Sequence, residues 1–102
     1  MATMAITKAE WSATNLPKGL EISSDGKIKG TPDVQPGTYT ATVSVSTYNN
    51  SILYGSDSKT ITINVAVPDS WKPVIEAGQV VNTTVNVAME YEIKGTNIKK
   101  TV

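Results

Sequence analysis

Three aromatic residues lie in segments rich in turn-forming residues, where side chains tend to face solvent: Tyr48, Tyr54 and Trp71. Flat aromatic rings stack on the apolar faces of sugars, and Tyr and Trp also carry a polar group at one end. These three residues are therefore the candidate ligand contacts, with a glycan as the candidate ligand. Core packing is the competing explanation, and it is the one expected for Trp11, which should be buried or half-buried.

Oxygen-bearing side chains in similar segments are candidates for calcium binding, because calcium takes carboxylate and carbonyl oxygens as ligands. They are Asp25, Asp33, Asp57 and Asp69, with Asn49 and Asn50. None of them is arranged as Asp-x-Asp or Asp-x-Asn-Asp, and turn formation by Asp and Asn accounts for every position. We therefore expect no cofactor and no metal site, with calcium as the alternative.

Glu90 and Glu92 form a carboxylate pair whose spacing suits acid–base chemistry, because residues two apart share one face of a strand. A solvated polar face flanking Tyr91 is the simpler explanation. The chain has no cysteine and no histidine, which excludes thiolate metal sites and cysteine catalysis. We expect a protein that is not an enzyme.

The charge and length of the chain limit its possible function and its number of domains. Nine basic residues, all of them lysine, balance nine acidic residues in a chain of 102 residues. Without a basic excess, and without the bidentate fork of arginine, nucleic-acid binding is not expected. A chain of this length suits one domain with a core sufficient for stability.

The elements that position these residues are expected to be β-strands. Residues 20–29 alternate apolar and polar side chains around Asp25-Gly26, which predicts a β-hairpin. Strict alternation also predicts long strands over 38–46 and 59–67, joined by a loop or short strand over 47–58. Two long strands with one polar face each suit an antiparallel sheet packed on a second sheet. No window shows a sustained 3.6-residue period, so helix content should be minimal.

The segment from Trp11 to Pro32, WSATNLPKGLEISSDGKIKGTP, closely resembles the repeat of Ig-like, cadherin-like domains of bacterial surface and secreted proteins. In that family the repeat reads aromatic, small residues, Leu-Pro-x-Gly-Leu, a turn with glycine, an apolar residue and Gly-Thr-Pro. The family's next features match Pro36-Gly37-Thr38-Tyr39 and a closing Thr60-Ile61-Thr62-Ile63-Asn64-Val65. The resemblance implies an all-β fold, an Ig-like two-sheet antiparallel β-sandwich, and transfers no catalytic residues.

The same resemblance divides the chain. Residues 1–10 are expected to be an N-terminal lead, residues 11–67 the main part of one repeat, and residues 68–72 a linker between two prolines. Residues 73–102 resemble the opening strands of a following repeat. The first repeat then lacks its own opening strands, and residues 73–97 are expected to pack back onto it as a single domain, in permuted order. Strand exchange between neighbouring copies is the alternative.

The resemblance implies a non-enzymatic structural or adhesion module, a spacer repeat of a bacterial cell-surface or secreted protein, with an extracellular location. Its expected partners are neighbouring repeats of the same chain and a host or cell-surface protein or glycan. The alternative is a carbohydrate-binding accessory module of a secreted glycosidase. That alternative requires Tyr48, Tyr54 and Trp71 to be exposed, and burial of these rings would count against it.

Overall fold

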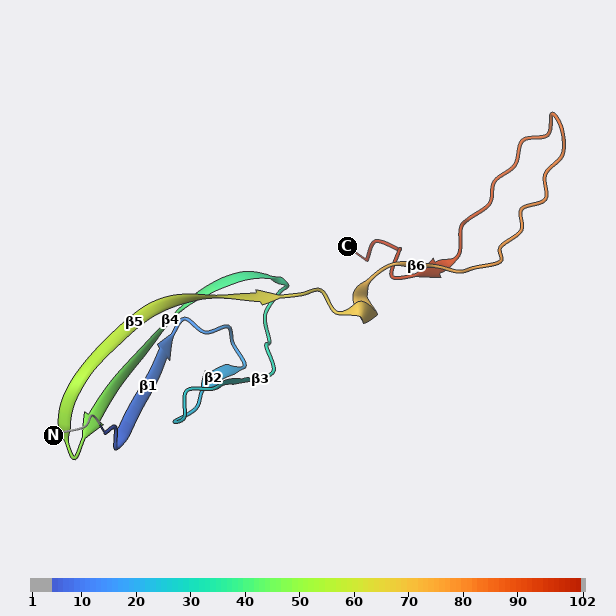
Figure 1. The fold of residues 1–102 in the computed structure, drawn as a ribbon. Helices are drawn as coiled ribbons and strands as arrows, with labels where there is room; N and C mark the ends of the chain where they lie inside the picture. Colours follow the sequence, from blue (N-terminus) through green and yellow to red (C-terminus); the bar gives the residue numbers. More distant parts are fainter. Residues whose placement is uncertain (1–4, 102) are drawn as a thin grey trace. The chain divides into compact units, whose positions relative to one another are not determined.

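The computed structural model describes residues 5–101, and the chain divides after Ala66 into two units (Figure 1). Strands dominate the described residues, where the one helical element is a 3-10 turn. No helix in this part of the chain is long and apolar enough to cross a membrane. The elements are β1 (Lys8–Thr14), β2 (Leu20–Ile22), β3 (Ile28–Gly30), β4 (Gly37–Asn49), β5 (Ile52–Val65), the 3-10 turn η1 (Asp69–Trp71), β6 (Val74–Ile75) and β7 (Gly95–Thr96).

The main sheet of the first unit has the order β1-β4-β5, and both pairings are antiparallel. Apolar side chains gather on one face, where Ala41 of β4 pairs with Ile61 of β5, and threonine and serine alternate with them along β4. The strand predicted over 38–46 is confirmed. So is most of the strand predicted over 59–67, although β5 ends at Val65.

The prediction of a loop or short strand over 47–58 is wrong. β4 continues to Asn49 and β5 begins at Ile52, so Asn50 and Ser51 form the whole turn. Both residues have positive φ, 45° and 74°. A two-residue loop with positive φ at both positions is the type I′ turn, whose twist matches that of the paired strands.

The physical reason for this error lies in the serines that follow the turn. A run rich in serine, glycine and aspartate has the composition of a loop, yet here the hydroxyls meet across the strand pair. Ser46 Oγ lies 2.7 Å from Ser56 Oγ, and Ser44 Oγ lies 2.9 Å from Ser58 Oγ. Cross-strand hydroxyl pairs of this kind stabilise a sheet face that is open to water.

A second, two-stranded sheet is formed by β2 and β3, which pair antiparallel from Leu20 opposite Gly30 onward. This confirms the hairpin predicted over residues 20–29. Trp11 of β1 reaches this second sheet and lies against Gly26 in its turn. The first unit is therefore an all-β, two-sheet antiparallel sandwich of Ig-like type, as predicted.

The glycines of the Leu-Pro-x-Gly-Leu and Gly-Thr-Pro motifs bring two backbones together. A Cβ added to Gly30 would collide with the carbonyl oxygen of Gly19, whose own backbone lies against Thr31. The amide of Asp33 donates to the carbonyl of Lys18 at 2.7 Å, and this hydrogen bond holds the same two backbone segments together. The two motifs therefore fix where the chain enters and leaves the β2–β3 hairpin.

Strand β1 was not predicted, and it begins inside the segment expected to be an N-terminal lead. Lys8 pairs with Tyr48 and Thr14 pairs with Thr42, so β1 runs along the full second half of β4. Residues 1–4 of the expected lead lie outside the described residues. Because β1 adds a third strand to the main sheet, both edges of β4 are paired.

Little apolar surface is fully buried in the described part of the chain. Ala41, at 1% exposure, is the buried apolar side chain of the main sheet. Its neighbours on the same face of β4, Tyr39 and Val43, are half-buried. The sandwich is therefore thin, and its hydrogen-bonded ladders contribute a large share of the contacts that hold it.

The second unit begins at Val67. The expected linker, residues 68–72, contains η1, and β6 pairs antiparallel with β7. Asn97 ties these parts together, because its side-chain Nδ2 donates to the carbonyl of Ser70 at 2.7 Å and to that of Lys72 at 3.0 Å.

Between β6 and β7 the chain runs out and back as a long ribbon (Figure 1), and we call residues 79–94 the arm. Gln79 closes its base. The Gln79 side chain donates to the carbonyls of Glu76 and Lys94 at 2.6 and 2.9 Å. It accepts from the Lys94 amide and the Tyr91 hydroxyl, both at 2.8 Å. Residues 73–97 thus contain two short paired strands, and their packing onto the first unit stays a prediction.

Candidate functional site

A shallow groove at the end of β1 and β4 is a polar site on the first unit. It is lined by Thr7, Lys8, Glu10, Tyr48, Asn50 and Ser51. The antiparallel register builds it, because Lys8 pairs directly with Tyr48 and Glu10 pairs with Ser46. Residues two apart on a strand share a face, so the ammonium, the carboxylate and the phenol meet on the outer side of the sheet.

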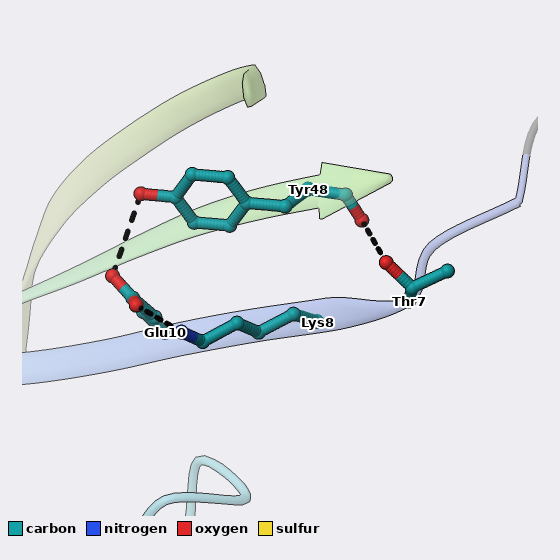
Figure 2. Close-up of polar contacts among 4 residues, drawn as sticks. All are labelled: Thr7, Lys8, Glu10 and Tyr48. Atoms are coloured by element: carbon teal, nitrogen blue, oxygen red, sulfur yellow. Dashed lines mark hydrogen bonds and ion pairs between the residues drawn. The ribbon is translucent and has the colours of Figure 1, made fainter. Parts of the chain in front are cut away.

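Figure 2 shows the polar contacts in this groove. Lys8 Nζ lies 2.7 Å from Glu10 Oε1, and the Tyr48 hydroxyl donates to Glu10 Oε2 at 3.4 Å. Lys8 Nζ also lies 5.9 Å from the centroid of the Tyr48 ring, within the range of a cation–π contact. The lysine therefore occupies one approach to the ring.

Backbone contacts hold the groove to the β4–β5 turn. The Thr7 amide and hydroxyl donate to the Tyr48 carbonyl at 2.9 and 3.3 Å, and the Asn50 amide donates to the Thr7 hydroxyl at 2.8 Å. The Asn49 side chain donates to the Ala5 carbonyl at 2.6 Å. The segment that leads into β1 is thereby fastened against the turn.

The ion pair sets the charge state of the groove. The hydrogen bond from Lys8, followed by the attraction of its charge, lowers the pKa of Glu10, and the same contacts with Glu10 raise the pKa of Lys8. Both groups are therefore charged at neutral pH. A carboxylate with a lowered pKa and a lysine with a raised pKa are poor proton carriers near pH 7. The groove can bind a polar ligand through charge-assisted hydrogen bonds.

The other two candidate aromatic residues lie elsewhere. Tyr54 is the extra residue of a β-bulge, because Thr47 pairs with Gly55 while Tyr48 pairs with Leu53. Its side chain is 46% exposed. Bulges commonly re-aim a side chain, and Tyr54 is not among the residues that line the groove.

Trp71 ends the 3-10 turn of the second unit and is 55% exposed. Tyr54 and Trp71 are exposed, as a sugar-binding surface requires, whereas Tyr48 is half-buried. Their joint role as ligand contacts stays a prediction.

The acidic candidates for calcium binding each have a lysine partner. The pairs are Asp25 with Lys27 at 3.5 Å, Asp33 with Lys18 at 3.6 Å, Asp57 with Lys59 at 2.9 Å and Asp69 with Lys72 at 2.9 Å. Over residues 5–101 no group of three or more His, Cys, Asp or Glu side chains is placed to hold a metal ion.

Glu92, one of the two carboxylates considered for acid–base chemistry, lies 3.3 Å from the Lys99 ammonium. The role of the two glutamates as a solvated face stays a prediction.

Sequence analysis missed the residues of β1 in the groove, namely Thr7, Lys8 and Glu10. A signal was present, because Ala9, Trp11 and Ala13 alternate with polar residues at the two-residue period of a strand. The alternating run is short, and whether it forms a strand depends on pairing with residues about forty positions away. Tyr48 was selected for its ring, which the structure places in the groove.

Comparison with known proteins gives one match. The family described as "Putative Ig domain" matches residues 2–66, which cover the first unit and more than half of the chain. No curated protein and no solved structure matches the chain.

Proposed function

Because the chain belongs to the family of Ig domains that its residues 2–66 match, we propose that it is a non-enzymatic structural and adhesion module. In this proposal it is a spacer repeat of a bacterial cell-surface or secreted protein and works outside the cell. Neighbouring repeats of the same chain are its first partners, and a host or cell-surface protein or glycan is the further partner. The sequence resemblance to cadherin-like repeats supports this setting.

The observation that carries the proposal is where the chain enters and leaves the main sheet. Strand β1 starts at Lys8, opposite Tyr48 and close to the β4–β5 turn. Strand β5 ends at Val65, opposite Gly37 at the other end of β4. Entry and exit therefore lie at opposite ends of the long strand pair (Figure 1). At about 3.4 Å per residue, the strand between those levels spans roughly 37 Å, so the first unit of each copy in a tandem array contributes about that length.

Small-angle X-ray scattering on polypeptides that contain one, two and three tandem copies of the whole chain tests the spacer role. We expect the maximum dimension to grow by equal increments of at least about 37 Å per copy. Collapse of the copies into one compact particle would contradict the proposal. Antibody labelling of intact source cells tests the location, and labelling only after cell lysis would count against it.

A carbohydrate-binding accessory module of a secreted glycosidase is the second candidate, favoured by the exposure of Tyr54 and Trp71. Titration with soluble polysaccharides would then shift tryptophan fluorescence, and Trp71→Ala would abolish the shift while leaving the emission of Trp11 unchanged. A chain whose fluorescence does not respond to any polysaccharide would remove this candidate.

A further inference from the structure

The arm has the composition of a strand but no strand partner within residues 5–101. Six of the eight residues from Val80 to Val87 are valine or threonine, the β-branched residues that favour strands. Yet no strand is assigned between β6 and β7 in the described residues. The one backbone-to-backbone hydrogen bond within residues 80–93 joins the Val87 amide to the Thr84 carbonyl at 3.1 Å. The other amides and carbonyls of residues 80–93 make no backbone-to-backbone hydrogen bond, so they are open to pairing.

The part of the arm from Gln79 to Met89 is also uncharged and rich in exposed apolar side chains. Val85 is 84% exposed and Val87 is 60% exposed, and Val80, Met89 and Ile93 are likewise open to solvent. No charged residue occurs from Gly78 to Met89. Strand edges are normally protected from association by charged residues, proline or short length, and this stretch of the arm has none of these protections.

A matching surface lies on the first unit. β5 is an outer strand of the main sheet and pairs only with β4 among the described residues. It is fourteen residues long, and its first nine, Ile52 to Thr60, are all exposed. They contain no proline, and their two charges, on Asp57 and Lys59, are paired with each other at 2.9 Å. This edge is therefore nearly neutral.

We propose that the arm of one copy adds to the free edge of β5 in a second copy of this chain, and that the second copy returns its own arm in a two-fold exchange. The added strand would pair the open backbone groups of arm and edge, as in other cases of strand addition. Nine residues of the edge and sixteen residues of the arm give twenty-five in each chain. A stable interface of standard size uses about 20–30 residues on each side.

This inference goes beyond the spacer role, because it concerns how two chains associate and does not depend on where the protein works. Its failure would leave the tandem-length test untouched. Two experiments on the full-length chain test it, one on the strength of association and one on which segments meet.

Sedimentation equilibrium measures the association of the full chain and of the double variant Val85→Lys, Val87→Lys. Both valines are exposed, so the fold of each unit should survive, which far-ultraviolet circular dichroism checks. Burying two unpaired ammonium groups against the edge should raise the dimer dissociation constant at least about tenfold. Val67→Lys is the matched control, because Val67 is 45% exposed and lies outside both arm and edge. A wild-type chain that stays monomeric up to about 100 μM, or a double variant that dimerises as well as the control, would overturn the proposal.

Cross-linking shows which segments meet. The chain has no cysteine of its own, so single replacements are specific. A chain with Val85→Cys is mixed with a chain carrying Ser56→Cys or Ser58→Cys and treated with a short bis-maleimide. We expect a covalent dimer of the two different chains. If a chain that carries Val85→Cys and Ser58→Cys together cross-links only within itself, the arm closes on its own molecule and the proposal is wrong.

Discussion

The indole of Trp11 lies so close to the α-carbon of Gly26 that a Cβ built there would come within 2.6 Å of the indole Cε2 atom. Gly26 also has a φ of 81°, in the left-handed region that side chains disfavour. We therefore expect Gly26→Ala to lower the free energy of unfolding by about 2–4 kcal/mol, the backbone cost and the steric clash together. Urea unfolding followed by tryptophan fluorescence measures it.

Gly55→Ala is the matched control for this substitution. A Cβ at Gly55 meets nothing within 4 Å, and Gly55 does not have a positive φ. Its replacement should change the free energy of unfolding by no more than about 0.5 kcal/mol. Equal effects of the two substitutions would show that the Trp11 contact does not hold the two sheets together.

The turn between β4 and β5 should accept a stabilising substitution. Ser51 has a φ of 74°, which glycine adopts without the cost that a Cβ imposes. We expect Ser51→Gly to raise the free energy of unfolding by about 0.5–1 kcal/mol. Ser51→Ala keeps the Cβ and should give no gain, and a gain from alanine as large as that from glycine would refute the explanation. Thermal unfolding of the three proteins provides the comparison.

The β2–β3 turn should show a pH-dependent contribution to stability. The hydroxyl of Ser23 donates to Asp25 and is the largest cause of the lowered pKa of that carboxyl. A folded-state pKa below the unfolded one means that the contribution is fully present above the unfolded pKa of about 3.9. It is lost as the pH falls through the folded pKa. We expect Ser23→Ala to raise the pKa of Asp25 and to reduce this loss on acidification.

Carboxyl chemical shifts followed by NMR between pH 2 and pH 6 would measure this change. Asp57 serves as an internal control, because its lowered pKa is due first to the Lys59 side chain and then to the Ser58 backbone, with no serine hydroxyl among the causes. An Asp25 pKa that is the same in Ser23→Ala as in the original chain would contradict the assignment of cause.

The base of the arm should depend on one side chain. Gln79 makes four hydrogen bonds there, including those with the Lys94 amide and the Tyr91 hydroxyl. Gln79→Leu removes all of them, so hydrogen exchange at the amides of Glu76 and Lys94 should speed up by at least about tenfold, the equivalent of 1.4 kcal/mol. Tyr91→Phe removes a single bond and should have a smaller effect. Unchanged exchange in Gln79→Leu would show that the backbone alone closes the arm.

The parts of the fold that could be predicted are those decided by neighbours in the chain. Asp25-Gly26 specifies its turn locally, and the period-two alternation over 38–46 marks a strand whatever its partner. Asn50-Ser51 failed as a turn signal because the type I′ turn is usually marked by Asn-Gly or Asp-Gly. The prediction for residues 47–58 therefore went wrong where serine gave a loop-like composition to a paired strand.

The groove and the arm could not be predicted from the sequence, because they depend on residues far apart in the chain. Lys8 and Glu10 form a groove only together with Tyr48, and that pairing depends on sheet order rather than on spacing along the chain. The residues from Val80 to Val87 have strand propensity, but a strand also needs a partner for its backbone, and residues 5–101 provide none that is paired with it. Strand propensity alone could not distinguish a paired strand from a segment of the same composition that has no paired neighbour within residues 5–101.

The apolar residues around Ala41 are only half-buried, and this has a calorimetric consequence. Unfolding a unit whose core side chains are only partly removed from water exposes less new apolar surface than usual, and the heat-capacity increment of unfolding follows that surface. The increment per residue should fall below the usual value of about 12–15 cal/mol/K. A shallow dependence on denaturant should accompany it. The melting curve of the isolated chain would then be broad, and any strand that came to cover the sheet would sharpen it.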